Sequence, residues 1–322
     1  MLKIPDKYLK PLDYLFIFRP TLFFPVWIIT LSGLSGAMYF NDNPVWWSTR
    51  VNITNILAFI CVTLATGSSF ILNQTRDIET DKINQKLFLI SEGYVPVKTA
   101  NKIALGSIVI SLAVLLLVDF KIFLLMGLLV LFGGYVYNYP PFEWKNKPIL
   151  GILVNFISGL FLFLSGWTLG GYGLKGAIVY SIPYLSAWTA VAILTTLPDK
   201  KGDEESNKVT ISVKVSNRNT VLFASIWLAL CFALSLYNQD PIISLPALLS
   251  LPLFLITIIK PSNTWILRSI RFPILFLGLM LSCEYPLFFL VIFVNYYLSK
   301  IYYMARFNLV YPTFNVDEKR ND

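Results

Sequence analysis

The sequence predicts an all-α protein, built as a polytopic membrane bundle of nine transmembrane helices. Of its 322 residues, 56% are hydrophobic and 14% are charged, whereas about 25% of residues are charged in an ordinary soluble domain. The mean hydropathy of +0.65 agrees with that imbalance. Stretches that are long enough to cross a bilayer, and almost free of charge, recur along the whole chain.

The nine predicted spans follow one another with polar loops between them. The third span is short, and the ninth is long and is interrupted by a single acid, Glu284. The turn from the fourth span to the fifth contains Pro140 and Pro141, which end the helix because neither donates a backbone hydrogen bond. In chain order the spans are residues 21–41, 51–75, 103–118, 122–142, 148–174, 176–198, 219–239, 241–259 and 272–299.

These spans form one transmembrane domain over residues 21–299. Residues 1–20 are a more polar N-terminal lead-in, for which an interfacial helix is one interpretation, and residues 300–322 are a C-terminal tail. Lysine and arginine concentrate in alternate loops, so we expect an integral, multi-pass membrane protein with a cytoplasmic N-terminus. Nine spans would place the two termini on opposite sides of the membrane.

The composition argues against several other classes of protein. The formal net charge of +8 is explained by cytoplasmic loops and a polyanionic substrate, and no basic stretch interleaves aromatic residues as a nucleic-acid site would. The chain has no histidine, the commonest transition-metal ligand. Its three cysteines, Cys61, Cys231 and Cys283, lie in apolar segments without ligand spacing, so we interpret them as packing residues.

Three oxygen-bearing side chains stand four residues apart after the second span: Asn73, Asp77 and Asp81. On a continuous helix each step of four turns the side chain by about 40° and advances it roughly 6 Å, so all three would share one face. Carboxylates and an amide oxygen suit Mg²⁺, which usually binds phosphate oxygens as well. The motif therefore points to a diphosphate substrate.

The alternatives to a metal site here are a polar exit of a helix from the membrane and an EF-hand loop. Asp77, Glu79 and Asp81 fit the opening of an EF-hand, but Lys82 replaces its turn glycine and Phe88 its closing glutamate. Arg76 and Glu79 lie off the face of the motif, and we interpret them as a solvated or locally paired face.

A second acidic pair, Asp199 and Asp203, follows the sixth span, and Gly202 between them permits a close backbone approach. Four spans separate the two clusters, so both lie on the same side, as they would after duplication of a four-helix unit. Lysine and arginine place that side in the cytoplasm. Two facing carboxylate clusters can hold two Mg²⁺ ions around one diphosphate, which a simple helix exit would not require.

At this point the chain resembles the UbiA family of intramembrane prenyltransferases over nearly its whole length. Its NxxxDxxxD motif is matched by Asn73, Asp77 and Asp81, and its DxxxD motif by Asp199 and Asp203. The turn YNYPPFEWK is similar to the YSxPPxxxK of the branch with chlorophyll synthase, homogentisate prenyltransferases and the archaeal geranylgeranylglyceryl phosphate enzymes. The resemblance implies a central cavity that opens to the cytoplasm.

The chain also departs from the family pattern. Where the family commonly has NKPxRPIxSG, Gln85 and Phe88 replace the usual lysine and arginine, and Lys86 stands one place off. Glu143 stands where a basic residue is frequent. Asn207 replaces a glycine, a change that we expect to be tolerated because asparagine also adopts the left-handed conformation.

The resemblance implies Mg²⁺-dependent transfer of a polyprenyl group from a prenyl diphosphate to a hydrophobic acceptor, either aromatic or lipid, within the bilayer. The allylic C–O bond would ionise, releasing diphosphate and an allylic carbocation. The predicted catalytic and metal-binding residues are Asn73, Asp77, Asp81, Asp199 and Asp203. The predicted substrate-binding residues are Arg19, Lys86, Tyr137, Tyr139 and Lys145.

Other interpretations are left open at this stage. Tyr137 and Tyr139 also fit an aromatic belt at the membrane surface, and Glu284 is either an acceptor contact or half of a pair across the bundle. A related protein that has lost catalysis and only binds is a second functional hypothesis. A cation transporter is a third, but it would place its acids near the middle of the membrane rather than at the ends of spans.

Overall fold

A computed structural model of the chain describes residues 5–41, 52–84 and 88–313, and the elements of these residues are all helices. Nine of these helices are long and apolar enough to cross a membrane, and a shorter apolar helix covers Phe120–Val136. The all-helical fold class is therefore confirmed. Nine described helices reach spanning length, but they are not the nine predicted ranges, and the shorter apolar helix comes in addition to them.

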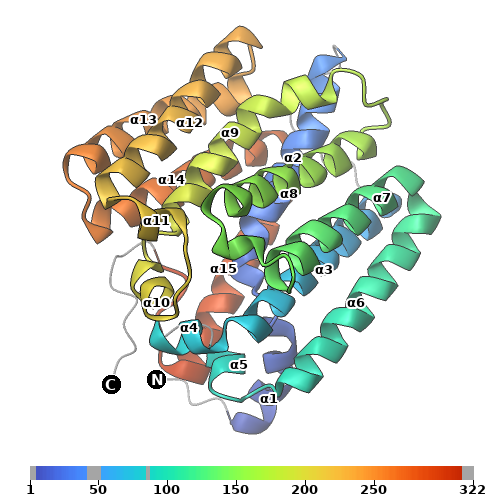
Figure 1. Ribbon diagram of the computed structural model, residues 1–322. Helices are drawn as coiled ribbons and strands as arrows, with labels where there is room; N and C mark the ends of the chain where they lie inside the picture. Colours follow the sequence, from blue (N-terminus) through green and yellow to red (C-terminus); the bar gives the residue numbers. More distant parts are fainter. Residues whose placement is uncertain (1–4, 42–51, 85–87, 314–322) are drawn as a thin grey trace.

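The long helices form two successive units of four, followed by a final pair (Figure 1). The first unit comprises α2 (Phe23–Phe40), α3 (Ile53–Arg76), α6 (Val97–Val118) and α7 (Phe120–Leu129), which η2 (Val130–Val136) continues. The second comprises α8 (Pro148–Leu169), α9 (Ala177–Thr195), α12 (Asn217–Tyr237) and α13 (Pro241–Ile259), and the final pair is α14 (Asn263–Glu284) and α15 (Pro286–Phe307).

Short helices gather at one end of this bundle, where they carry the polar loops (Figure 1). In each unit, the loop after the second long helix contains two of them. They are α4 (Ile78–Ile83) and α5 (Phe88–Ser91) in the first unit, and α10 (Lys200–Glu205) and α11 (Ile211–Lys214) in the second. This repetition agrees with the inference of a duplicated four-helix unit.

The two units meet where α2 packs against α8, the first helix of one against the first helix of the other. Glycine makes this contact possible. A Cβ atom added to Gly33 would lie 1.9 Å from the carbonyl oxygen of Phe163, and one added to Gly166 would lie 1.7 Å from that of Thr30. The backbones of α2 and α8 therefore touch directly, as small residues allow between membrane helices.

The predicted ninth span, 272–299, is wrong as a single helix. It contains the end of α14 and most of α15, which are separated at Tyr285. Pro286 causes the break because it lacks a backbone N–H and disfavours helical geometry in the residue before it, and Tyr285 has φ −121° and ψ 80°. The predicted fourth span, 122–142, corresponds to the shorter helix α7 with η2.

The prediction that the chain termini lie on opposite sides is also wrong. Near the start of the chain, Asp13 of α1 (Asp6–Phe16) accepts hydrogen bonds from two residues near its end: Tyr302 Oη at 2.6 Å and Arg306 Nη2 at 2.7 Å. The extra helix explains the error, because α7 with η2 also traverses the bundle and makes the number of crossings even. Which end of the bundle faces the cytoplasm stays a prediction.

Helix α1 lies at the same end as the short loop helices (Figure 1). Its inner face buries Leu9, Asp13 and Phe16, while Tyr8 and Leu15 are exposed on its outer face. A short helix with apolar groups on its outer face suits the boundary between bilayer and water, in agreement with an interfacial lead-in.

We predict that Gly166→Ala destabilises the protein through the contact between α2 and α8. The added methyl group meets backbone atoms of α2, so the two helices must separate, at a cost of about 1–3 kcal/mol or more. Gly127→Ala on α7 is the matched control, because no atom lies within 4 Å of its added Cβ. Thermal unfolding in detergent measures the difference, and equal midpoints for the two variants would contradict this account.

Candidate active site

The two acidic loops meet at the end of the bundle, where α4 packs against α10. Two hydrogen bonds join them. The backbone N–H of Gly202 donates to Asn84 Oδ1 at 3.1 Å, and Thr80 Oγ1 donates to Ser206 Oγ at 3.0 Å. The structure thus brings together loops that are more than a hundred residues apart in the sequence.

The backbone at these loops has the special geometry that the sequence predicted. A Cβ atom on Gly202 would lie 2.3 Å from Asn84 Nδ2, so the Asn84 side chain could not keep this position against a larger residue. Asn207 has φ 55°, in the left-handed region. Both expectations, a close approach at Gly202 and a left-handed asparagine in the usual place of a glycine, are confirmed.

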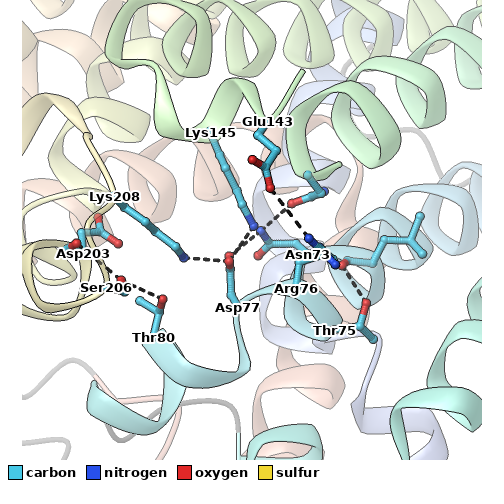
Figure 2. Close-up of polar contacts among 12 residues, drawn as sticks. Asn73, Thr75, Arg76, Asp77, Thr80, Glu143, Lys145, Asp203, Ser206 and Lys208 are labelled. Atoms are coloured by element: carbon cyan, nitrogen blue, oxygen red, sulfur yellow. Dashed lines mark hydrogen bonds and ion pairs between the residues drawn. The ribbon is translucent and has the colours of Figure 1, made fainter. Parts of the chain in front are cut away.

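Asp77 is the centre of the polar contacts between the loops (Figure 2). Its Oδ1 atom accepts hydrogen bonds from Lys145 Nζ at 2.5 Å and from Lys208 Nζ at 2.7 Å. Its Oδ2 atom accepts one from Asn73 Nδ2 at 2.8 Å. The side chains of Asp77 and Lys145 are only 13% and 8% exposed, so this ion pair is largely withdrawn from water.

The spacing predicts that the three residues of the first motif share one face of a continuous helix, but in the structure they do not. Helix α3 ends at Arg76, and Asp77 has φ −107° and ψ 17° before α4 begins at Ile78. Asp77 is thus the cap of both helices. At this boundary the Asp77 side chain contacts lysines of two other segments, which the spacing alone does not encode.

A π-helical segment, η2, positions the partner of Asn73. Asn138 follows η2 and donates from Nδ2 to the carbonyl oxygens of Gly133 and Gly134, at 3.2 and 2.8 Å. Its Oδ1 accepts from Asn73 Nδ2 at 2.8 Å. π-helical turns leave such backbone groups free and often occur at functional sites. Asn138 therefore fixes the orientation of the Asn73 amide toward Asp77.

The remaining acids carry charge that the lysines do not fully offset. Burial raises the pKa of the Asp81 carboxyl to about 7, and the nearby Asp77 and Asp199 add to the effect while Arg19 and Lys208 oppose it. Burial likewise raises the pKa of Asp203 to about 6. For Asp77 burial acts in the same direction, but Lys145 and Lys208 hold its pKa below the ordinary value.

These residues fit a divalent cation by their chemistry. In the part of the chain that the structure describes, no three His, Cys, Asp or Glu side chains converge tightly enough to hold a metal alone. The available donors are carboxylate and amide oxygens, the kind that Mg²⁺ prefers. The raised pKa values of Asp81 and Asp203 show that a positive charge between the loops would relieve repulsion and burial cost.

A cavity of about 820 Å³ lies beside this site and continues between the helices, and of the residues of the two motifs it is Asn73 that lines it. Asn73, Arg19 and Tyr137 line it beside the acidic loops, and its remaining walls are mainly apolar residues of α2, α3, α8, α9, α14 and α15. Arg19 has a positive φ of 58°. The turn that holds it is fixed by Gln74 Nε2, which donates to the carbonyl oxygen of Ile17 at 2.8 Å.

Other predicted residues lie elsewhere. Tyr139 stacks on Tyr135, with Arg76 over its ring, and it is absent from the described lining of the cavity. Lys86 and Gln85 fall outside the described residues. Glu284 is buried at the far end of α14 beside Ser35, and among the described residues it does not line the cavity either.

Arg76 is partly exposed, and the partner that the structure gives it belongs to another segment rather than to its own loop. Its Nη2 atom lies 3.8 Å from Glu143 Oε1 (Figure 2). The acid that replaces the usual basic residue of this turn therefore has a basic partner on α3. Arg76 and Glu79 also line a second, polar pocket of about 340 Å³.

Three residues of the site were missed from the sequence: Lys208, Asn138 and Asn84. Lys208 stands five residues after Asp203, and its place in the sequence indicates only that it adds a positive charge to the loop. Asn138 lies inside the tyrosine turn, and Asn84 opens the altered NKPxRPIxSG segment. Their positions beside recognised motifs were a usable signal, but their partners depend on the tertiary fold.

This fold and site define an integral membrane protein with a charged site at the mouth of an apolar cavity. A model of the UbiA prenyltransferase family matches residues 26–274. The chain therefore belongs to that family, as its motifs indicated.

Among curated relatives, 2-acyl-4-prenylphloroglucinol 6-prenyltransferase of Humulus lupulus is 28% identical over 216 residues, which is 64% of this chain and 52% of the relative. Digeranylgeranylglyceryl phosphate synthase of Methanocaldococcus jannaschii is 23% identical over 57% of this chain and 62% of its own. The chain thus spans little more than half the length of these relatives.

Among solved structures, a UbiA homologue from Archaeoglobus fulgidus bound to GPP and Mg²⁺ superimposes with a TM-score of 0.63. The match has 18% identity and covers 86% of this chain and 99% of that one. At this identity the likeness supports the fold, and it adds that the same helical arrangement accommodates a prenyl diphosphate with a divalent ion in that protein.

We predict that Gly202→Ala loosens the contact between the two acidic loops. Its methyl group would displace the Asn84 side chain and break the hydrogen bond between the loops, so backbone hydrogen exchange over residues 78–84 and 200–206 should become faster. Asn84→Ala is the comparison, since it removes the same hydrogen bond without the clash and should have the smaller effect. Unchanged exchange in Gly202→Ala would show that the loops are held together by other contacts.

Proposed function

We propose that this protein is a Mg²⁺-dependent prenyltransferase, which moves a polyprenyl group from a prenyl diphosphate to a hydrophobic aromatic or lipid acceptor and releases diphosphate. The observation that carries the proposal is the position of the joined acidic loops at the mouth of the large apolar cavity. A prenyl diphosphate has the matching division, with a polyanionic head group and a long apolar chain.

The proposed metal ligands are Asn73, Asp77, Asp81, Asp199 and Asp203, the oxygen-bearing residues of the two motifs. Bound there, Mg²⁺ would neutralise the negative charge that develops on the diphosphate as the allylic C–O bond breaks.

The lysines of the chain share that task. Lys145 and Lys208 approach Asp77 from two different segments and point into the same space (Figure 2). When a diphosphate is present, their ammonium groups would donate to its oxygens and remain partly neutralised by Asp77. Lys208 would thereby supply a positive charge that the altered segment at Gln85 and Phe88 lacks. We keep Lys86 as a further candidate contact.

The cavity would protect the prenyl cation from water until the acceptor attacks. Tyr137 lines its mouth and would orient the head group through its hydroxyl, with Arg19 on the opposite side near Asp81. Tyr139, which contacts Arg76 instead, would act on the substrate only indirectly. The acceptor gives up a proton in the transfer, and the released diphosphate or water at the polar end of the cavity would take it up.

We propose that the acidic loops face the cytoplasm, together with both ends of the described chain. Arg306 now lies on this side with the loops, which strengthens the asymmetry of basic residues from which the orientation was predicted. The cavity would then open to the cytoplasmic side, from which the charged head group of the donor and Mg²⁺ can reach it through water.

We predict that Asp203→Asn and Asp81→Asn each lower prenyl transfer roughly 100-fold or more, because each removes a charge from the site that balances the leaving diphosphate. The assay is transfer from radiolabelled geranylgeranyl diphosphate to a small panel of aromatic and lipid acceptors, with and without Mg²⁺. Glu205→Gln is the control, since this acid lies in the same loop with its side chain half exposed. Full activity in both aspartate variants would overturn the enzymatic assignment of these acids.

A second prediction concerns Lys208, because its role was visible only in the structure. Lys208→Met should weaken binding of inorganic diphosphate about tenfold, as loss of one charge-assisted hydrogen bond would. Lys214→Met, an exposed lysine of the same loop, should leave binding unchanged. Calorimetric titration in the presence of Mg²⁺ measures both variants, and equal affinity in the two would exclude Lys208 from the head-group site.

A further inference from the structure

The last long helix, α15, lies beyond residues 26–274, the region that the family model matches. It is also a peripheral helix. In its apolar part 22% of residues are buried, against 61% in α9. The simplest role for a helix in this position is to anchor the protein in the lipid. The distribution of its side chains indicates a further role.

Two faces of α15 differ in chemistry. The residues that line the cavity follow the helical spacing of a single stripe and are largely aromatic: Phe289, Ile292, Phe293, Tyr296 and Tyr297. Phe289, Phe293 and Tyr297 are about half exposed, as are large residues of α15 outside the cavity lining, but the latter are aliphatic: Leu290, Val291, Val294, Leu298 and Ile301. The aromatic side chains in this part of α15 are thus concentrated on the face toward the cavity.

The rings of this stripe form a continuous row. The centroids of Phe289 and Phe293 are 6.3 Å apart, and those of Phe293 and Tyr297 are 4.5 Å apart. The ring of Tyr296 contacts that of Tyr297 at 5.4 Å. From residue 289 to residue 297 the helix rises about 12 Å, so the row extends well along the cavity.

Contacts with the start of the chain fix the direction of the row. Asn295 Nδ2 donates to the carbonyl oxygen of Pro20 at 2.8 Å, next to Arg19 at the mouth of the cavity. At the other end, Ile292 approaches Gly278 of α14, which in turn lies against Ile28 inside the bundle. Tyr297 is therefore the ring nearest the mouth, and Phe289 is the deepest.

We propose that the aromatic stripe of α15 is the wall along which the prenyl chain of the donor lies, and that it determines which donor lengths the protein prefers. The inference rests on the proposed function. With the diphosphate held at the acidic loops, the first isoprene unit lies near Tyr297, and each later unit lies deeper, toward Phe289. The chain carries methyl groups and double bonds, which pack well on aromatic rings.

In this arrangement, the donors whose binding is weakened by a substitution depend on how deep in the cavity the substituted ring lies. A short donor such as dimethylallyl diphosphate would end before Phe289, whereas geranylgeranyl diphosphate would extend past it. Phe289→Ala should therefore weaken binding of geranylgeranyl diphosphate about tenfold, because the prenyl chain would lose its contact with one aromatic ring, and leave binding of dimethylallyl diphosphate unchanged. Phe293→Ala, one turn nearer the mouth, should also weaken geranyl diphosphate.

The test is calorimetric titration of the purified protein with dimethylallyl, geranyl, farnesyl and geranylgeranyl diphosphates, with Mg²⁺ and without acceptor. The matched control is Leu290→Ala, which removes a large side chain from the adjacent position on the outer face. Unchanged binding of dimethylallyl diphosphate and an unchanged unfolding midpoint show that each variant is folded.

The same length preference in Phe289→Ala, Phe293→Ala and wild-type protein would overturn the inference, as would an equal change in Leu290→Ala. Prenyl transfer, assayed in parallel, separates this result from the proposed function. If Phe289→Ala changes the preference for donor length but the wild-type protein transfers no prenyl group to any acceptor, the inference about α15 is supported and the catalytic proposal is refuted.

Discussion

The carboxylate of Asp77 is the group on which the arrangement of the site depends. It is largely withdrawn from water, and a buried charge without partners is costly. Its partners come from three places in the chain: Asn73 on its own helix, Lys145 in the turn before α8, and Lys208 after α10. Satisfying one carboxylate therefore requires that the first loop, the tyrosine turn and the second loop come together.

A second constraint separates charge from apolar surface. The ionic groups of the candidate site lie at one end of the bundle, while the cavity beside them continues inward between mainly apolar walls. The close contact of α2 with α8, through Gly33 and Gly166, joins the two four-helix units whose loops carry the acids. The same duplication that builds the bundle thus supplies one acidic cluster from each half.

The spans, the family and the acidic motifs could be predicted because each is written in a local pattern: hydrophobic length, residue spacing or turn residues. Gly202 and Asn207 were predictable for the same reason, since both reflect backbone geometry. The boundary between α3 and α4 at Asp77 and the contacts of its side chain were not, because the lysines that it contacts lie far away in the sequence. The break between α14 and α15 had a local signal in Pro286, but the surrounding apolar run obscured it. The roles of Lys208, Asn138 and Asn84 depend on which loops meet, and the inward aromatic face of α15 depends on the neighbours of that helix.

The hydrogen bonds that join Asp13 to the end of α15 affect the order in which the protein can assemble. Asp13 is synthesised early, whereas its partners Tyr302 and Arg306 leave the ribosome almost three hundred residues later. Until α15 has entered the bilayer, α1 lacks these partners and the cavity lacks its aromatic wall. The earlier helices can insert and pair during translation, but the finished cavity has to await the last one. A chain whose synthesis stops before this helix would contain both acidic loops but would lack one wall of the cavity. Membrane quality control would have to recognise it by the open cavity, because its polar motifs are complete.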